Sequence, residues 1–465
     1  MTLSALSAAA RKSEYAVAPE LMLTPDGVEE DLVLVVRKGR IAAIANIAEH
    51  DGDVVRLPGY AVIPGFVDAH THVGQIFGKA LIGGEPAQIW RRVWHPMEAA
   101  MGPDEAYASA KWMCLEALRG GFTTLVSYGL NDTDKNAGVH RAVEESGLRF
   151  VSSTGLDQYA GDIGTGSGVH ELSEIFDRIE RHVEQCRQHT RITPSVCCSS
   201  FHANSPETLS ALSEYCAKQG LLLQIHANEH FPELQDCLLR FGKRPTQFLN
   251  AIGVLGPHVL LHHTTIISED EIEILSKTRT ATSYNPLASI WKGNAVAPAL
   301  RYAQRNVRFG IGSDNTSEDA FRNLFAAEAG QRVAHAMPVA DFSCGAAWTW
   351  VNAATCGAAD AAGMGAGIGS LAPGMAADFL LLDMNVPECL PAIDFEWELV
   401  RYYNRDQIAA MVVDGTLVAM EGQPLAWNMT VVITELGQTA EAVAQAPEIV
   451  RLHGPSVRYR PRRRG

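Results

Sequence analysis

Residues 62–72 read Val-Ile-Pro-Gly-Phe-Val-Asp-Ala-His-Thr-His, an apolar run that ends in two histidines separated by one residue. On an extended strand, residues i and i+2 point to the same side. His70 and His72 can therefore direct two imidazoles to one point, and neutral imidazole is a good ligand for zinc, iron and similar ions. Two histidines at this spacing also arise by chance, so the motif needs support from the rest of the chain.

From residue 64 onward, strand-like apolar runs alternate with helix-like segments such as 104–120, which ends at a pair of glycines. Alternating β and α elements imply a parallel sheet, and eight strand–helix pairs imply a closed (β/α)8 TIM barrel with its active site at the C-terminal ends of the strands. The eight predicted strands are residues 62–69, 123–127, 148–155, 191–198, 221–226, 258–263, 279–284 and 307–313.

Both ends of the chain are β-rich. Residues 32–36 and 41–45 flank a turn and predict a hairpin, and residues 369–383 and 411–418 predict further strands. We therefore predict a small β-sandwich domain formed by both termini. Its two parts are residues 1–62 and residues 369–465, which include the C-terminal tail, and residues 63–368 form the barrel.

The composition favours a soluble globular protein with a large core, since 47% of the 465 residues are hydrophobic and 20% are charged. A net charge of −15 argues against nucleic acid as a partner. We interpret the terminal arginines as a frayed, solvated end rather than a nucleic-acid or membrane tail. They are Arg458, Arg460, Arg462, Arg463 and Arg464.

No apolar run reaches the ~18 residues that span a bilayer, and the first twelve residues do not follow the pattern of a signal peptide. Nine cysteines, an odd number, do not suggest a disulfide framework. We therefore expect a cytoplasmic protein with no membrane partner and with buried, unpaired cysteines.

Further candidate metal ligands stand where predicted strands end. His226 ends the fifth strand, His262 and His263 end the sixth, and Asp314 follows the eighth. In a closed barrel these ends converge, and three imidazoles with one carboxylate and an open position describe a catalytic metal site. A single histidine could instead cap a hydrogen bond, and Asp314 could be a turn residue. Their joint occurrence at strand ends favours the metal site.

Glu229 lies three residues after His226. A carboxyl group just beyond a metal ligand could carry a proton between water and substrate. It could equally be a glutamate at the start of a helix, favoured there by the helix dipole. The spacing alone leaves both interpretations open, and the neighbouring His230 has no assigned role.

These motifs resemble the amidohydrolase superfamily, in particular its aminohydrolase branch of triazine hydrolases and of guanine, cytosine and adenosine-derivative deaminases. The resemblance covers roughly residues 15–425, and its motifs fall in the family's order and spacing. The matching segments are residues 64–72, 226–229, 259–263, 283–286, 312–315 and 369–378.

The resemblance implies that His70, His72, His226 and Asp314 bind one divalent metal ion, Zn²⁺ or alternatively Fe²⁺. Binuclear relatives carry a carboxylated lysine at the end of the fourth strand, and residues 191–198 contain no lysine. This difference favours one metal ion and the deaminase branch.

The resemblance also implies catalytic roles for three residues. His263 polarises the attacked group or orients the water, Glu229 shuttles the proton, and Asp314 is the base that accepts a proton from the water. The residue before the family's histidine is usually small, so His262 is a departure, and either His262 or His263 faces the site.

Two further departures concern the substrate. Tyr284 stands where many deaminases have histidine, and residues 199–207 lack the pattern that binds the sugar in nucleoside-type deaminases. An adenosine-like substrate is therefore not expected. Candidate substrate residues lie just beyond the predicted strands, where ordinary loop packing is the alternative. They are Gln75, Trp90, Trp94, Tyr128, Asp157, Tyr159, His202 and Asn315, with Gln75 favoured.

We expect the protein to deaminate a heteroaromatic or amidine-type small molecule by attack of metal-bound hydroxide. Two alternatives remain open: hydrolysis of a C–Cl, C–S or amide bond by the same site, and a non-catalytic scaffold on the same fold. The resemblance further implies a homodimer or a larger homo-oligomer.

Overall fold

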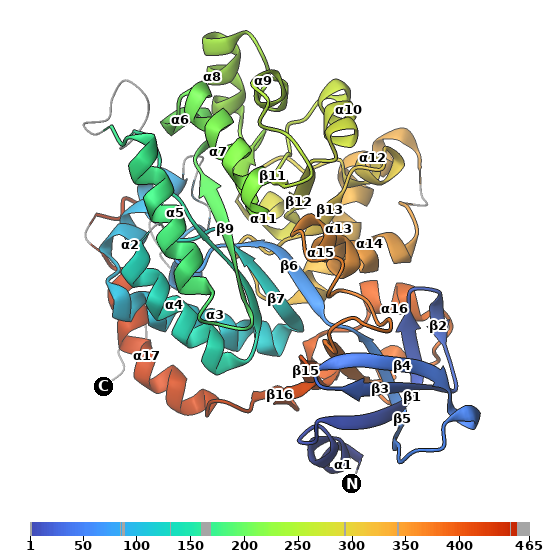
Figure 1. Ribbon diagram of the computed structural model, residues 1–465. Coiled ribbons are helices and arrows are strands. Elements are labelled where there is room, and N and C mark those ends of the chain that lie inside the picture. The colour runs from blue at the N-terminus through green and yellow to red at the C-terminus, as the bar shows by residue number, and fades with distance from the viewer. Residues whose placement is uncertain are drawn as a thin grey trace.

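The computed structural model describes residues 2–83, 85, 89–130, 132–159, 169–292, 294–341, 344–446 and 448–452. Its strands form an eight-stranded sheet and a nine-stranded sheet. Figure 1 shows the first surrounded by helices, with the second below it near the N-terminus. No helix within these ranges combines the length and the apolar character needed to cross a bilayer.

The eight-stranded sheet is the predicted barrel, and every neighbouring pair in it is parallel. Its strands follow one another in chain order, each separated from the next by helical segments. The barrel and a small β domain built from both ends of the chain confirm the expected architecture. The barrel strands are β6 (Phe66–Thr71), β7 (Phe122–Ser127), β8 (Arg149–Thr154), β9 (Ile192–Cys198), β10 (Leu222–Ala227), β11 (Val259–His263), β12 (Ala281–Tyr284) and β13 (Phe309–Ile311).

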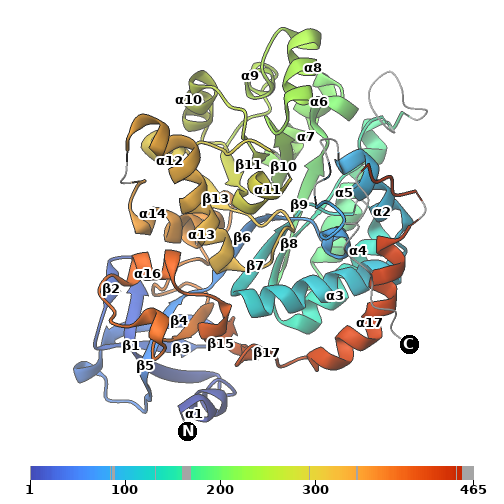
Figure 2. The same cartoon turned by 180° about the vertical axis from the view of Figure 1, so that it is seen from behind.

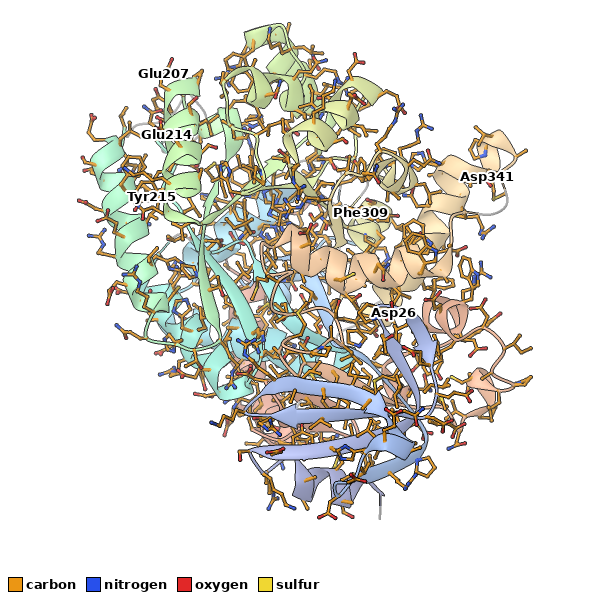
Figure 3. The ribbon with its side chains drawn as sticks, turned by 45° about the vertical axis from the view of Figure 1, so that its right-hand side comes forward. Asp26, Glu207, Glu214, Tyr215, Phe309 and Asp341 are labelled. Atoms are coloured by element: carbon orange, nitrogen blue, oxygen red, sulfur yellow. The ribbon has the colours of Figure 1, made fainter. Side chains whose placement is uncertain are left out.

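Helices cover the outside of the barrel (Figures 1 and 2), and exposed residues such as Glu207 and Glu214 mark the outer surface of α7 in Figure 3. The barrel helices are α3 (Pro103–Gly120), α4 (Thr133–Ser146), α5 (Leu172–Cys186), α6 (Ser200–Ala203), α7 (Pro206–Gln219), α8 (Phe231–Phe241), α9 (Pro245–Ala251), α10 (Glu269–Thr278), α11 (Pro286–Trp291), α12 (Ala299–Gln304), α13 (Ala320–Gln331), α14 (Ala347–Ala354) and α15 (Cys356–Ala361).

Two helical segments of the barrel are each divided in two. Residues 232–252 form α8 and α9, because Gly242 ends α8 with a left-handed φ of 65° and Pro245 begins α9. Residues 343–362 contain α14 and α15, which meet at Thr355, where φ is −125° and ψ is −100°.

The nine-stranded sheet joins the two ends of the chain. β14 pairs with β5 on one side and with β15 on the other, so C-terminal strands continue an N-terminal sheet. The sheet contains β1 (Glu14–Thr24), β2 (Gly27–Glu29), β3 (Leu32–Arg37), β4 (Arg40–Asn46), β5 (Val55–Pro64), β14 (Phe379–Asp383), β15 (Ile408–Val413), β16 (Thr416–Met420) and β17 (Gln423–Pro424). The proposed domain boundary after residue 62 falls inside β5, which a single residue, Gly65, separates from β6.

Several further helices lie outside the alternation of barrel strands and helices. The chain after β17 forms a long helix, α17 (Met429–Ala444), that packs against α3 on the barrel instead of continuing the β domain. The others are α1 (Thr2–Ala9), the π-helical turn Trp90–Trp94, α2 (His95–Ala100) and α16 (Phe395–Arg401). The terminal arginines lie outside the described residues. None of the nine cysteines forms a disulfide bond, and all but Cys356 are buried.

An ion-pair network connects the barrel to the small sheet. Arg149, on β8, donates from Nε to Asp378 Oδ2 at 2.6 Å and from Nη2 to Asp414 Oδ1 at 2.7 Å. The backbone N–H of Asp414 donates to the other oxygen of Asp378 at 2.6 Å. Both Arg149 and Asp378 are largely buried, so these charge-assisted bonds fix the base of β8 against the small sheet.

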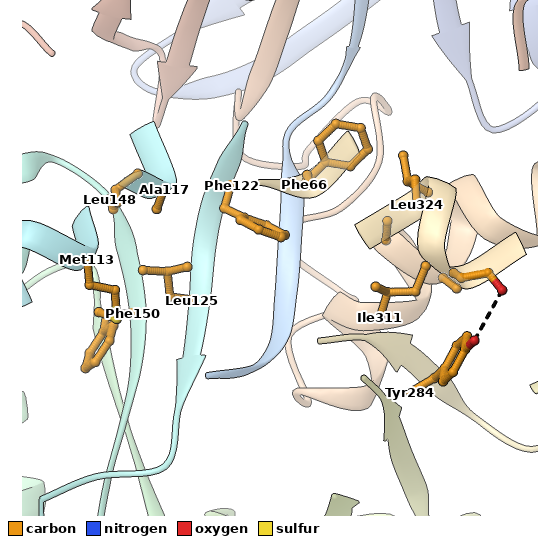
Figure 4. Close-up of a cluster of buried hydrophobic side chains, with 14 of the residues drawn as sticks. Phe66, Met113, Ala117, Phe122, Leu125, Leu148, Phe150, Tyr284, Ile311 and Leu324 are labelled. Carbon is orange, nitrogen blue, oxygen red and sulfur yellow. Dashed lines mark hydrogen bonds between the residues drawn. The ribbon is translucent and has the colours of Figure 1, made fainter. Parts of the chain in front are cut away.

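The core between barrel and helices is aromatic and aliphatic. Phe66, Phe122 and Phe150, from the neighbouring strands β6, β7 and β8, are all buried, and Figure 4 shows them with Met113 and Leu125. Strands of a parallel sheet that are covered by helices bury both faces, which explains their continuous apolar sequences.

The barrel closes where β6 meets the end of β13. The backbone N–H of Asp314 donates to the carbonyl of His70 at 2.8 Å, and the N–H of Ser313 donates to Asp68 Oδ1 at 2.9 Å. Thr71 Oγ1 donates to Glu318 Oε1 at 2.6 Å. We call this set of contacts the β6–β13 seam.

Gly312 is required at this seam. A Cβ at this position would lie 2.3 Å from Asn285 Oδ1 and 2.9 Å from His70 Cβ. We expect Gly312→Ala to lower the free energy of unfolding by about 1–3 kcal/mol, because the neighbours are buried and cannot yield easily. Gly437→Ala in α17 is the matched control, since its Cβ would meet no atom within 4 Å. Urea denaturation measures both variants, and equal midpoints would contradict the prediction.

Candidate active site

Three histidines from two barrel strands lie together at the C-terminal end of the barrel. His70 is on β6, His72 follows it, and His226 is on β10. The ring centroid of His70 lies 4.7 Å from that of His72 and 4.9 Å from that of His226. The ring centroids of His72 and His226 are 5.3 Å apart. The structure therefore brings together residues that are more than 150 positions apart in the sequence.

Asp314 completes this group. Its Oδ1 lies 3.3 Å from His72 Nε2 and 3.5 Å from His70 Nε2. One ligand atom each from His70, His72 and His226 lie within 4.8 Å of one another, and the same holds for His70, His263 and Asp314. The four predicted ligands thus face one point.

The chemistry of this group fits a divalent metal ion. His70 is completely buried, and neither of its ring nitrogens has a hydrogen-bond partner among the described residues. Burial lowers the pKa of His70 to about 3 and the pKa of His226 well below its ordinary value. Both imidazoles are therefore neutral and available as ligands, and a set of imidazoles with one carboxylate suits zinc or iron.

The structure distinguishes His262 from His263. His262 lies inside the barrel, where its Nε2 contacts Gln224 Oε1 and its Nδ1 contacts Ser283 Oγ, each at 3.1 Å, and its ring stacks on His70. His263 has a left-handed φ of 72°, which breaks the alternation of the strand and turns a second side chain inward. His263 is thus the histidine beside Asp314 and Glu229, whereas the ring of His262 packs against that of His70.

Two contacts orient His263. Its Nδ1 lies 3.1 Å from the amide nitrogen of Asn285, which can only donate, so Nδ1 accepts and the ring proton is on Nε2. Its Nε2 lies 3.6 Å from Glu229 Oε1. The neutral ring therefore presents an N–H group toward the site.

Glu229 Oε1 also receives other partners. It accepts a hydrogen bond from Asn294 Nδ2 at 3.1 Å and lies 3.0 Å from His230 Nε2. Burial alone would raise the pKa of Glu229, but His263 and His230 hold it well below its ordinary value. Burial likewise opposes a charged His230, but Glu229 raises the pKa of His230 to about 9. The two residues form an ion pair whose proton is on His230.

Lys292 is a site residue that no sequence motif indicated. Its Nζ donates to Asp314 Oδ2 at 2.6 Å and to the Asp314 carbonyl at 2.9 Å, and it lies 5.6 Å from the centroid of the Trp94 ring. Burial alone would raise the pKa of Asp314, but Lys292, His70 and His72 hold it well below its ordinary value. Asp314 is therefore an ionised carboxylate.

Four of the predicted substrate residues lie beside the histidine group. Tyr128 has its ring centroid 4.6 Å from that of His226, and buried Trp94 lies under Lys292. Asn315 Nδ2 donates to the carbonyl of His72 at 2.5 Å. Gln75 donates its backbone N–H to the same carbonyl and is hydrogen-bonded to Glu98 through its side chain.

The other predicted substrate residues have different surroundings. Trp90 is 49% exposed, and its ring lies against His95. His202, on α6, stacks on Phe201. Asp157 accepts hydrogen bonds from the Ser199 backbone and from Asn204 Nδ2, as expected for loop packing. Tyr159 donates its backbone N–H to the carbonyl of Ala203.

Tyr284 does not lie on the substrate side. Its side chain is completely buried, and its hydroxyl donates to the carbonyl of Ala327 on α13 at 3.2 Å (Figure 4). The replacement of a histidine by Tyr284 therefore changes the packing between β12 and α13. It does not provide an argument about the substrate.

Comparison with known proteins supports this architecture. Relatives include a 5-methylthioadenosine/S-adenosylhomocysteine deaminase of Nitratidesulfovibrio vulgaris, 28% identical over 85% of this chain and 89% of the relative. A 5'-deoxyadenosine deaminase of Methanothermobacter thermautotrophicus is 29% identical over 87% of this chain and 92% of the relative.

Two crystal structures show the same fold. An adenosine deaminase from Xanthomonas campestris with bound zinc superposes with a TM-score of 0.83 at 20% identity, covering 93% of this chain and 98% of the other. An atrazine chlorohydrolase from Arthrobacter aurescens complexed with zinc gives 0.79 at 18% identity, covering 92% and 100%. The sequence model of the Amidohydrolase family matches residues 61–418, which include the whole barrel. This chain belongs to the amidohydrolase family.

Proposed function

We propose that this protein is a metal-dependent aminohydrolase that removes an amino group from a heteroaromatic or amidine-type small molecule and releases ammonia. The observation that carries the proposal is the convergence of His70, His72, His226 and Asp314 on one point beside Glu229. The deaminase names of the relatives support this choice within the family.

His70, His72, His226 and Asp314 would hold one divalent cation, which we propose to be zinc, with iron as the alternative. Such a cation would lower the pKa of a water molecule toward ~7 and so provide a nucleophile at neutral pH. Two crystal structures of this fold contain bound zinc, which favours zinc as the ion for this chain.

Asp314 is suited to accept a proton from the attacking water. Its carboxylate is buried and ionised, and Lys292 fixes Oδ2 while Oδ1 faces His70 and His72. A positioned, ionised carboxylate is an effective general base. Lys292 is thus a positioning residue for Asp314.

Glu229 is suited to carry protons on the other side of the site. It would give a proton to a ring nitrogen of the substrate and later assist the departure of ammonia. His230, which is protonated and 3.0 Å from Glu229, can supply that proton. His263 directs its Nε2–H toward the attacked centre and stabilises charge that develops there.

The surroundings of the site suit a flat, aromatic substrate. Trp94 and Tyr128 provide aromatic surfaces, and Gln75 and Asn315 provide amide groups close to His72. We keep Trp90 and His202 as outer candidates. The deaminase names of the relatives place adenosine-type purines among the first compounds to test. We also propose a homodimer or larger homo-oligomer. We propose a cytoplasmic location, which is supported by nine cysteines that form no disulfide bonds.

The reaction is tested by incubating the metal-loaded protein with aminopurines, adenosine derivatives, aminopyrimidines, pterins and triazines. We expect ammonia release from at least one class, and loss of this activity after chelation, with recovery on adding zinc. Release of chloride or thiol without ammonia would favour the alternative hydrolysis. Turnover that is indifferent to chelation would exclude the proposed site.

The ligand set is tested by His72→Asn and Asp314→Asn. Loss of a residue that only supports a metal ligand weakens metal binding roughly 10–100-fold. Removing a ligand itself should weaken binding by more than this. Metal content after dialysis measures this loss. His170→Asn at a partly exposed position is the control and should retain the metal. Unchanged metal content in both ligand variants would contradict the assignment.

The proton carrier is tested by Glu229→Gln. Glutamine keeps the size of the side chain but cannot carry a proton, so kcat should fall about 10²–10⁴-fold while metal content stays the same. Glu435→Gln, on the exposed face of α17, is the matched control and should not change kcat. Full activity of Glu229→Gln would show that Glu229 has another role.

A further inference from the structure

A second group of metal-ligating side chains lies outside the proposed active site. His140 is on α4, and His182 and Cys186 are on α5, which pack against each other and against β8 on the outside of the barrel. All three side chains are buried, with exposed fractions of 1%, 1% and 0%. The proposed reaction uses none of them.

The distances within this group match those of a tetrahedral metal site. Cys186 Sγ lies 3.5 Å from His182 Nε2 and 3.9 Å from His140 Nε2, and the three ligand atoms lie within 4.8 Å of one another. With Zn–N near 2.0–2.1 Å and Zn–S near 2.3 Å, a tetrahedral angle separates nitrogen and sulfur by about 3.6 Å. His182 and Cys186 are four residues apart on one helix, so they share a face of α5.

Both buried imidazoles direct Nε2 toward Ser152 and the Cys186 thiol. His140 Nε2 lies 2.8 Å from Ser152 Oγ, and His182 Nε2 lies 2.9 Å from the carbonyl of Ser152. A metal ion bound at the two Nε2 atoms would replace these contacts, and the buried Nδ1 atoms, which have no partner within the described part of the chain, would then carry the ring protons. Burial also lowers the pKa of His140 to about 3, so its imidazole is neutral, as a ligand must be.

Neighbouring residues provide a fourth ligand position and further polar groups close to the site. Ser152 Oγ, 2.8 Å from His140 Nε2, can complete a tetrahedron, directly or through water. The ring of His189 lies 5.5 Å from that of His140, and its Nδ1 is 2.6 Å from Glu144 Oε2. His189 and Glu144 also line a small surface cavity.

We propose that His140, His182 and Cys186 form a second, structural metal site that binds one zinc ion and ties α4 and α5 to β8. Binding forms two Zn–N bonds and one Zn–S bond. It releases one proton, since the Cys186 thiol must become a thiolate. Two imidazoles and one thiolate are ligands that zinc accepts readily, whereas the proposed active site contains no sulfur ligand.

The sulfur ligand makes the two sites separable by spectroscopy. The full-length protein is stripped with a chelator and titrated with Co²⁺, and metal content and near-ultraviolet absorption are followed. We expect two equivalents per chain and a thiolate-to-cobalt charge-transfer band. Cys186→Ser should abolish the band and leave one equivalent. Cys216→Ser, at another buried thiol, should change neither.

Other outcomes overturn the proposal. A wild-type protein without the band has no thiolate site, and a band that persists in Cys186→Ser belongs to another cysteine. If Cys186→Ser does not fold, X-ray absorption of the wild-type protein loaded with two equivalents of zinc decides. A sulfur shell near ~2.3 Å supports the site, and nitrogen or oxygen shells alone exclude it. His72→Asn should remove only the other equivalent, so failure here is distinct from failure of the proposed function.

Discussion

The closure of the barrel at the β6–β13 seam is the constraint on which the rest of the site depends. A parallel sheet closes only when its last strand returns to its first, and here the N–H of Asp314 donates to the carbonyl of His70. This one backbone bond places a carboxylate from late in the chain beside an imidazole from early in it. The neighbouring bonds of Asp68 with Ser313 and of Thr71 with Glu318 keep the two segments in this register. The geometry of the proposed metal ligands is thus a consequence of barrel closure.

The site also depends on residues in a left-handed backbone conformation. Asn228, His263, Thr264, Asp314 and Asn315 all have φ between 45° and 72°, although none is glycine. Such conformations cost free energy and persist only where surrounding contacts enforce them. At these positions the chain leaves the end of a strand, and neighbouring side chains can both point inward. In a regular strand, successive side chains would point to opposite faces. His262 and His263 can both face the interior for this reason.

Much of the architecture was predictable because the alternation of apolar strands and helices is a local signal. Seven of the eight barrel strands end within two residues of their predicted ranges, whereas the first predicted strand, residues 62–69, combines the end of β5 with most of β6. The side chains of His70, His72, His226 and Asp314 lie together at the end of the barrel. Other features depend on tertiary contacts that leave no periodic pattern. α17 is one of them: it packs against α3, and the sequence did not predict it.

Individual side chains were still less predictable. Lys292 follows α11 without any motif, and only the fold places its amine against Asp314. The choice between His262 and His263 required the φ of His263, which adjacent residues in a sequence do not reveal. Tyr284 occupies a family motif position, yet it packs against α13. In each case the deciding contact joins segments that only the closed barrel brings together.

The junction of β5 and β6 has a consequence for how this protein can be divided. Only Gly65 separates the two strands, and its N–H donates to the carbonyl of Asp378 at the start of β14. The ribbon that carries His70 and His72 therefore runs without a linker out of the terminal sheet. An excised barrel would lose the anchorage of its opening strand, and the same argument makes the surface loops between barrel helices the better places for new chain ends in a circular permutant.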